Sequence, residues 1–157
     1  MGGDVGIDVR RAGAQDADAL SALRFRWRTI ERGEFGLDDV SFARELSAWM
    51  DDHVDSHFAF LARRDGEPVG MAWLAIVERV PGPGRLQRRS GYVQSVYVTP
   101  PSRSSGIGHM LMQRLVDEAG ELELDYLAVH PSDRSFDFYR SLGFSDSTRV
   151  LERRDEL

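Results

Sequence analysis

Apolar residues recur along this chain with two different spacings, and the spacing changes several times. Alternating apolar residues predict strands, whereas apolar residues three and four positions apart predict helices. The first half therefore begins with a strand at 7–10, followed by a helix at 17–28 that Asp16 caps and a second helix at 39–52. Two strands at 58–63 and 68–80 follow, and the turn between them is typical of a hairpin.

The second half begins with a strand at 92–99, which precedes a helix at 107–119 and a strand at 124–129. A further helix begins at Ser132 or Asp133 and stops at Gly143, and a last strand covers 144–152. The strand–helix–strand unit predicts a right-handed parallel crossover, while the hairpins are antiparallel. We therefore expect one α/β domain over residues 1–157, with a mixed, mostly antiparallel sheet and helices on both faces.

Composition excludes several kinds of chemistry. The chain has no cysteine, so disulfides, thiolate metal sites and a cysteine nucleophile are excluded. All 20 basic residues are arginine, and the absence of lysine excludes Schiff-base chemistry and a P-loop lysine. Of the four histidines, only His53 and His57 have a ligand-like spacing and a third ligand is missing, so we expect no metal.

Charge is distributed unevenly along the sequence. Residues 31–55 hold eight acids and two arginines, whereas residues 79–116 hold six arginines and no acid. This division favours an anionic cofactor and a cationic substrate. Nucleic acid is a poor fit because the net charge is −6 and no basic stripe is interleaved with aromatic residues. Without a signal region or a membrane-length apolar run, we expect a cytoplasmic protein that does not bind membranes.

The glycine-containing turn after the strand at 92–99 carries the most specific chemistry. Arg103 begins an Arg-x-x-Gly-x-Gly sequence that ends at Gly108 and opens the helix at 107–119. Free N–H groups at such a helix start, beside an arginine, can bind a pyrophosphate. A dinucleotide fingerprint would need a third glycine near Leu111, which is absent.

This turn, together with the Phe-Tyr-Arg-Ser-Leu-Gly-Phe sequence at 138–144, resembles the GCN5-related N-acetyltransferases (GNAT family). The resemblance is strong over residues 92–144. It implies a GNAT-like acyl-CoA N-acyltransferase fold with a central splayed parallel strand pair. It also implies transfer of an acetyl group from acetyl-CoA to a primary amine.

The resemblance also implies residue roles. The strand at Val96, Tyr97 and Val98 would pair with the pantetheine arm of acetyl-CoA. The pyrophosphate would lie on the turn formed by Arg103, Ser104, Ser105, Gly106, Ile107 and Gly108. Further cofactor contacts are expected from His109, Arg140 and Ser132, the last standing where the family usually has asparagine.

Tyr139 matches the residue that protonates the departing thiolate. The ordinary pKa values are compatible with this role, because that of a thiol is near 8.5 and that of a tyrosine hydroxyl is near 10. The alternative is that Tyr139 is a packing residue on an apolar helix face.

The base that deprotonates the amine is less well defined. The family often has a glutamate where this chain has Gln94, which leaves Glu78, Glu31 and Glu34 as candidates. A water chain is favoured over each of them.

The acceptor also stays open. The acidic segment favours a cationic small molecule such as a polyamine or an aminoglycoside-like compound, or a peptide amine. Acetylation of protein N-termini and a catalytically weak acyl-CoA-binding regulatory module are the alternatives. The sequence does not distinguish a monomer from a homodimer.

Overall fold

The structure, a computed structural model, describes residues 6–155. Its elements, in chain order, are β1 (Ile7–Arg11), η1 (Ala14–Asp16), α1 (Ala17–Arg26), the π-helical turn η2 (Trp27–Glu31), α2 (Asp39–Asp52), β2 (His57–Arg64), β3 (Glu67–Arg79), β4 (Arg88–Val98), η3 (Pro100–Ser102), α3 (Ile107–Glu121), β5 (Leu127–Val129) and α4 (Phe136–Ser141).

The strands form one five-stranded sheet in the order β1-β2-β3-β4-β5. The first four strands pair antiparallel, and β4 and β5 pair parallel through the connection that contains α3. Asp65 and Gly66 both have positive φ values, 49° and 85°, as the tightest hairpin turns require. The predicted hairpin and the predicted parallel pair are therefore confirmed.

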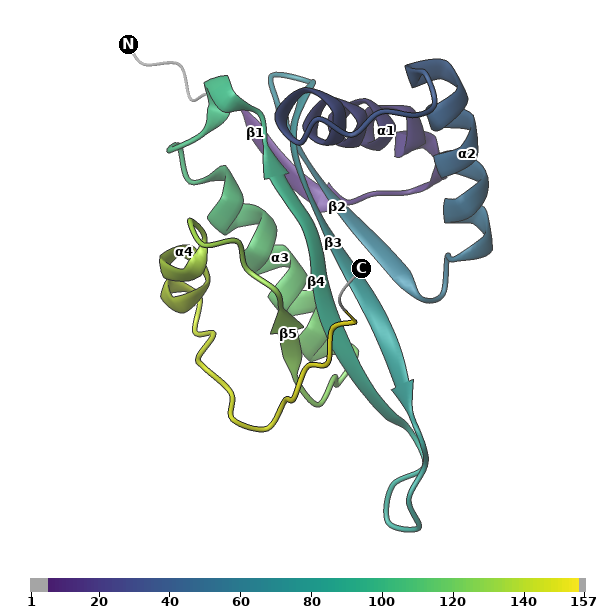
Figure 1. Cartoon of the computed structure of the whole chain (residues 1–157), viewed down its shortest axis with the longest axis vertical. Helices are drawn as coiled ribbons and strands as arrows, with labels where there is room; N and C mark the ends of the chain where they lie inside the picture. The colour runs from purple at the N-terminus through teal and green to yellow at the C-terminus, as the bar shows by residue number, and fades with distance from the viewer. Residues whose placement is uncertain (1–5, 156–157) are drawn as a thin grey trace.

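Helices lie on both faces of the sheet (Figure 1), and each face buries its own apolar cluster. On one face, Leu111 and Leu115 of α3 pack against Phe60, Leu74 and Val93 of the sheet. On the other face, α1 contributes the buried Leu20 and Leu23, which pack against side chains of β2, β3 and β4. Helices thus cover both faces, as the apolar patterns predict.

Strand β4 has an irregularity that matters for the site. Ser95 and Val96 lie opposite a single β3 residue, Ala72, which defines a β-bulge, and Ser95 has a φ of 55°. Strand β5 pairs with β4 only over Gly91–Val93. Among the described residues, the β5-side edge of β4 therefore runs on without a partner strand to Val98.

The fold class is confirmed, with two differences in its C-terminal part. Helix α4 is shorter than predicted. The predicted strand at 144–152 is wrong, because the structure assigns no strand after β5 within the described residues. Phe144 packs against the core cluster, but Val150 and Leu151 are 60% and 97% exposed, so the alternation at 144–152 does not continue as a buried strand. The parallel pair consequently lies at the β5 edge of the sheet.

No helix within residues 6–155 combines the length and the apolar content needed to cross a membrane.

Candidate active site

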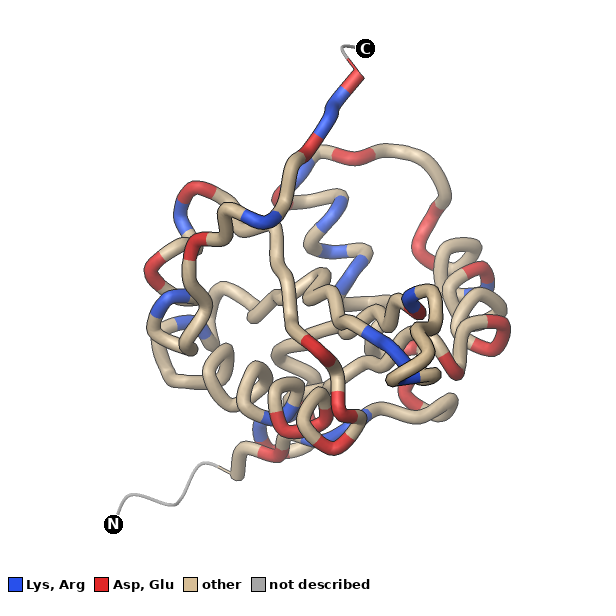
Figure 2. The backbone as a smooth tube through the Cα atoms, turned by 90° about the horizontal axis from the view of Figure 1, so that it is seen from below, with Lys and Arg blue, Asp and Glu red and all other residues tan. Residues whose placement is uncertain are grey.

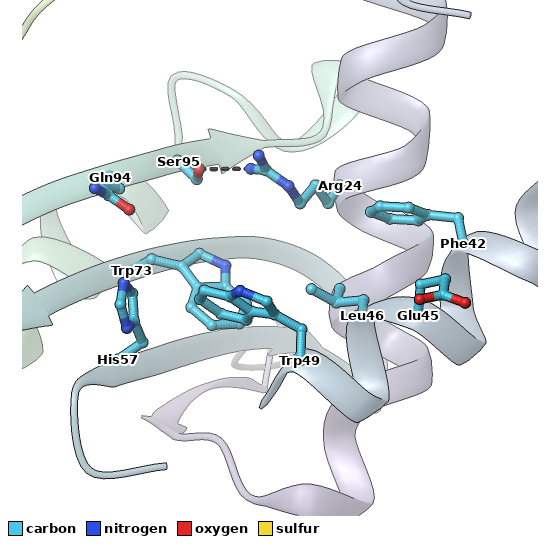
Figure 3. Close-up of a pocket in the computed structure, with 9 residues that line it drawn as sticks. All are labelled: Arg24, Phe42, Glu45, Leu46, Trp49, His57, Trp73, Gln94 and Ser95. Atoms are coloured by element: carbon cyan, nitrogen blue, oxygen red, sulfur yellow. Dashed lines mark hydrogen bonds between the residues drawn. The ribbon is translucent and has the colours of Figure 1, made fainter. Parts of the chain in front are cut away.

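A cavity of about 400 Å³ opens on the sheet face that α1 and α2 cover. Side chains from both helices and from β2, β3 and β4 converge on it (Figure 3). They are Arg24, Phe42, Glu45, Leu46, Trp49, His57, Trp73, Gln94 and Ser95. The cavity therefore reaches β4 at Ser95, the residue where the bulge occurs.

Arg24 reaches from α1 to this bulge. Its Nη1 donates a hydrogen bond to Ser95 Oγ at 2.6 Å. Burial lowers the pKa of Arg24, the positive charge of Arg28 adds to this effect, and Glu34 opposes it. Glu34 itself pairs with Arg28, and no carboxylate in the described part of the chain forms an ion pair with Arg24.

Aromatic rings form the α2 side of the cavity. Trp49 stacks on His53 with ring centroids 4.1 Å apart and meets the edges of His57 and Trp73 at 4.7 and 6.2 Å. Burial lowers the pKa of His57 below its ordinary value of 6.5, and the charge of His53 lowers it further. The His57 imidazole is therefore neutral at pH 7, with Ser56 Oγ 2.8 Å from its Nδ1.

The predicted anion-binding turn lies between β4 and α3. Ser104 and Gly106 both have positive φ values, 62° and 84°. No side chain caps α3, and its first turn contains no acidic residue. The first N–H groups of α3 are consequently free of side-chain caps and favour a negative charge. The Ile107 side chain is fully buried, so only its main chain can face a ligand there.

Arg103 is engaged by protein groups in this structure. Its Nη2 donates to both carboxylate oxygens of Glu31, at 2.7 and 3.0 Å, and its Nε donates to Val98 O at 2.9 Å. Its guanidinium also lies over the ring of Tyr97, a buried residue that stacks on Trp27.

The outer edge of β4 carries the main-chain groups expected to meet the pantetheine arm. Thr99 donates its N–H to Val69 O on β3, so strand alternation directs the main-chain groups of Val96 and Val98 to the opposite edge. This edge has no partner strand beyond Val93 in the described part of the sheet. The edge thus offers main-chain groups that no strand pairs with, and Val98 O accepts its hydrogen bond from the Arg103 side chain instead.

Tyr139 is buried at 8% exposure within the core cluster beneath α3. Its ring packs edge-on against Phe138 and Phe144. Burial raises the pKa of Tyr139 to about 12, and within residues 6–155 the hydroxyl makes no hydrogen bond. The side chain therefore stays protonated at every physiological pH.

Other predicted cofactor residues lie around α4. His109 Nε2 is 3.0 Å from Ser141 Oγ, so this side chain is directed toward α4. Ser132 Oγ is 3.1 Å from Ser135 Oγ in the turn that precedes the helix. Arg140 is exposed and pairs with two carboxylates of its own neighbourhood.

None of the three glutamates predicted as a base lines the cavity. Glu31 is held by Arg103, and Glu34 is held by Arg28. Glu78 lies near the end of β3, five positions after Trp73, which corresponds to roughly 16 Å of strand. All three assignments stay predictions.

The two charged segments have different spatial arrangements. Acidic residues gather along α2 (Figure 2), the helix that contributes Glu45 to the cavity. The arginines of the basic segment are divided between the ends of β4, because Arg79 and Arg85 pair with Asp125 far from the turn that contains Arg103. Charge thus favours a cationic ligand near α2 but does not form one basic surface.

Sequence reasoning missed the roles of Arg24, Glu45 and His57 at the cavity. Glu45 had a signal, since it lies in the acidic segment on a predicted helix. Arg24 and His57 had none, because only the folded chain brings α1 and the start of β2 to the same cavity. No group of three or more potential metal-ligating side chains occurs in the described residues.

Comparisons of the sequence and of the structure with known proteins all point to acetyltransferases. The chain matches the sequence model of the acetyltransferase (GNAT) family over residues 23–144. It is 31% identical over 125 residues to a mycothiol acetyltransferase of Frankia alni, an alignment that covers 76% of this chain and 36% of that protein. The chain thus spans about a third of the length of this curated relative.

Solved structures share the fold. A predicted acetyltransferase from Clostridium acetobutylicum, crystallised with acetyl-CoA, superposes with a TM-score of 0.75 at 24% identity, covering 95% of this chain and 96% of the other. An aminoglycoside acetyltransferase from an uncultured soil metagenomic sample superposes with a TM-score of 0.77 at 17% identity, covering 96% of both chains.

Proposed function

The chain belongs to the acetyltransferase (GNAT) family, and on that premise we propose that it transfers an acetyl group from acetyl-CoA to a primary amine of a small molecule. One observation carries the proposal. The cavity and the unpaired edge of β4 meet at the Ser95 bulge, so a ligand on each side of the strand would reach the same point.

The cofactor side fits the residues that are present. The uncapped start of α3 suits a pyrophosphate, and Arg103 can pair with it after leaving Glu31. The outward main-chain groups of Val96 and Val98 suit the amide-bearing pantetheine arm. The turn itself is formed in part by Ser104, Ser105 and Gly108. From the side of α4, the cofactor would be contacted by His109, Ser132 and Arg140.

The acceptor side fits an amine. A primary amine is an ammonium ion at neutral pH, and the exposed Glu45 carboxylate at the cavity rim attracts it. The faces of Trp49 and Trp73 also favour a cation. The relative named mycothiol acetyltransferase and the structures named aminoglycoside acetyltransferases act, by those names, on small molecules, which supports the same choice.

The chemistry divides between the two sides of β4. When bound, acetyl-CoA supplies a thioester whose C–S bond breaks as the C–N bond forms, while one of the two protons lost by the ammonium ends on sulfur and the other in solvent. A main-chain N–H at the bulge polarises the carbonyl, and Tyr139 donates a proton toward the departing sulfur.

The base faces the cavity. Neutral His57 accepts the proton that the ammonium loses, through water where it does not reach the nitrogen. Glu31 and Glu78 act only through longer water chains, since neither lines the cavity.

Two measurements on the full chain test this function. Calorimetry with acetyl-CoA should show binding, and a thiol-release assay over a panel of small amines should show turnover. Binding without thiol release from any amine would favour the regulatory module instead. Release with peptides alone would favour acetylation of protein N-termini, and failure to bind acetyl-CoA would contradict all three functions.

A further inference from the structure

Arg24 is a cation in the wall of the cavity, and no carboxylate within residues 6–155 pairs with it. It is half-buried, and its one hydrogen bond to a described residue is to the neutral hydroxyl of Ser95. A guanidinium has five N–H donors, so most of its donors are free to meet a ligand. Burial of an unpaired charge is unfavourable, and an anionic ligand group would offset that cost.

The position of Arg24 limits which acceptors the cavity favours. The reacting nitrogen must come to the bulge, and Arg24 Nη1 is 2.6 Å from Ser95 Oγ at that point. An ammonium ion arriving there alone would meet a like charge across a few ångströms of partly dry cavity. A ligand that brings its own negative charge beside the amine would avoid this repulsion.

We propose that the acceptor is an α-amino acid, whose carboxylate binds the Arg24 guanidinium while its α-amine lies at the Ser95 bulge. This inference rests on the proposed function and narrows its substrate class. The carboxylate and the amine of an α-amino acid are joined through one carbon, which matches the closeness of Arg24 to the bulge. The planar guanidinium also suits a carboxylate, because two parallel N–H donors can meet its two oxygens.

The remaining wall selects the side chain of this amino acid. Phe42, Leu46, Trp49 and Trp73 supply apolar and aromatic surface, as Figure 3 shows around the Arg24 side chain. A large apolar or aromatic side chain would bury its surface there. Polyamines and aminoglycoside-like compounds carry no carboxylate, and the geometry therefore disfavours them.

Matched pairs of acceptors test the inference. Thiol release is measured with L-phenylalanine and phenethylamine, and with L-tryptophan and tryptamine, pairs that differ only by the carboxylate; spermidine is a polycationic comparison. Binding is measured separately as the thermal shift that each compound causes without acetyl-CoA. The variants are Arg24→Gln, which removes the charge, and Arg24→Lys, which keeps it without the fork. Arg26→Gln, on the exposed side of the same helix, is the control.

The wild-type chain should prefer each amino acid over its decarboxylated partner by about 10- to 100-fold in kcat/KM, the value of hydrogen bonds to a charged group. Arg24→Gln should remove most of that preference and the thermal shift by the amino acid, Arg24→Lys should retain part of both, and Arg26→Gln should change neither.

Two results would overturn the inference while leaving the proposed function intact. One is turnover of the decarboxylated amines or spermidine at equal or higher efficiency. The other is an equal loss for both members of each pair in Arg24→Gln, which would make Arg24 a support of the bulge. No thiol release and no thermal shift with these compounds would overturn the inference alone if other amines of the panel are acetylated, and would overturn the proposed function as well if the chain also fails to bind acetyl-CoA.

Discussion

Glu31 and Arg103 stand 72 residues apart in the sequence, yet one guanidinium nitrogen of Arg103 contacts both oxygens of the Glu31 carboxylate. Glu31 ends the segment that follows α1, and Arg103 begins the turn before α3 that we propose for the pyrophosphate. The Nε of the same arginine also donates a hydrogen bond to Val98 O, which lies on the edge of β4 proposed for the pantetheine arm. Binding of the cofactor must therefore replace these contacts.

Glu31→Gln should bind acetyl-CoA more tightly than the wild-type chain, because Arg103 would no longer have to leave a carboxylate. A partly exposed ion pair is worth about 0.5–1 kcal/mol, which corresponds to a roughly two- to five-fold lower Kd by calorimetry. Glu34→Gln is the matched control, since Glu34 pairs with Arg28 instead. A large fall in kcat with unchanged affinity would show instead that Glu31 is the base.

Tyr139→Phe should lower kcat by roughly 100-fold or more, the usual effect of losing a general acid. The ring should still fill its place beside Phe138 and Phe144, so the thermal midpoint should stay close to that of the wild-type chain. With a pKa of about 12, Tyr139 stays protonated up to pH 10, and it should add no basic limb to the rate profile below that pH. Full turnover by the variant would remove Tyr139 as the acid.

The raised pKa of Tyr139 also bears on how the proton moves. Transfer from a group at about 12 to a thiolate near 8.5 is uphill by roughly 5 kcal/mol if it occurs as a separate step. The proton should therefore move as the C–S bond breaks, so kcat should show a solvent isotope effect in deuterium oxide wherever chemistry limits the rate. In Tyr139→Phe the part of the isotope effect that comes from the tyrosine proton should be absent. An unchanged isotope effect in this variant would contradict proton donation by Tyr139.

Gly106→Ala should destabilise the turn before α3. Gly106 has a φ of 84°, where a Cβ costs about 1–2 kcal/mol, and the strain falls on the N–H groups proposed for the pyrophosphate. Both the thermal midpoint and the affinity for acetyl-CoA should fall. Gly120→Ala, inside α3 with open space around its Cβ, should instead stabilise by about 0.5–1 kcal/mol. Equal effects of the two substitutions would contradict this account of the turn.

Protonation of His57 should destabilise the fold at low pH. Because burial lowers the pKa of His57, the unfolded chain takes up this proton near pH 6.5 before the folded chain does. The contribution is zero above that pH, and stability is lost progressively as the pH falls below it. Urea midpoints at pH 7.5 and 5.5 should differ less in His57→Gln than in the wild-type chain. Glu45 and Arg24 line the same cavity, and the His53 ring packs against that of His57, so only this difference between the two proteins isolates His57. Equal midpoint differences would contradict the shifted pKa.

Local sequence patterns predicted the elements that are determined by residues close together in the sequence. The Asp65–Gly66 turn, the alternating strands and the glycine-bearing start of α3 each depend on neighbouring residues, and each is present in the structure. The strand expected at 144–152 is absent, because an alternating sequence alone does not supply a neighbouring strand to pair with. Val150 and Leu151 remain exposed, and this segment forms no strand beside β5.

The acceptor cavity depends on contacts between distant segments. Arg24 looks in sequence like any charged residue of a helix, and 71 positions separate it from Ser95. The bulge that places Ser95 is a register shift between β3 and β4, which neither strand's sequence reveals by itself. The glycine-containing turn before α3 was therefore predictable, whereas the cavity required the folded chain.

The most direct test of the account follows a labelled acetyl group. The full chain is incubated with acetyl-CoA carrying ¹³C in the acetyl group and with the amine panel, and products are identified by mass spectrometry as free thiol is counted. Labelled N-acetylated product and free thiol should form in equal amounts, and both should fall in Tyr139→Phe. Thiol release without a labelled amide, or binding with neither product, would contradict acetyl transfer to an amine at this site.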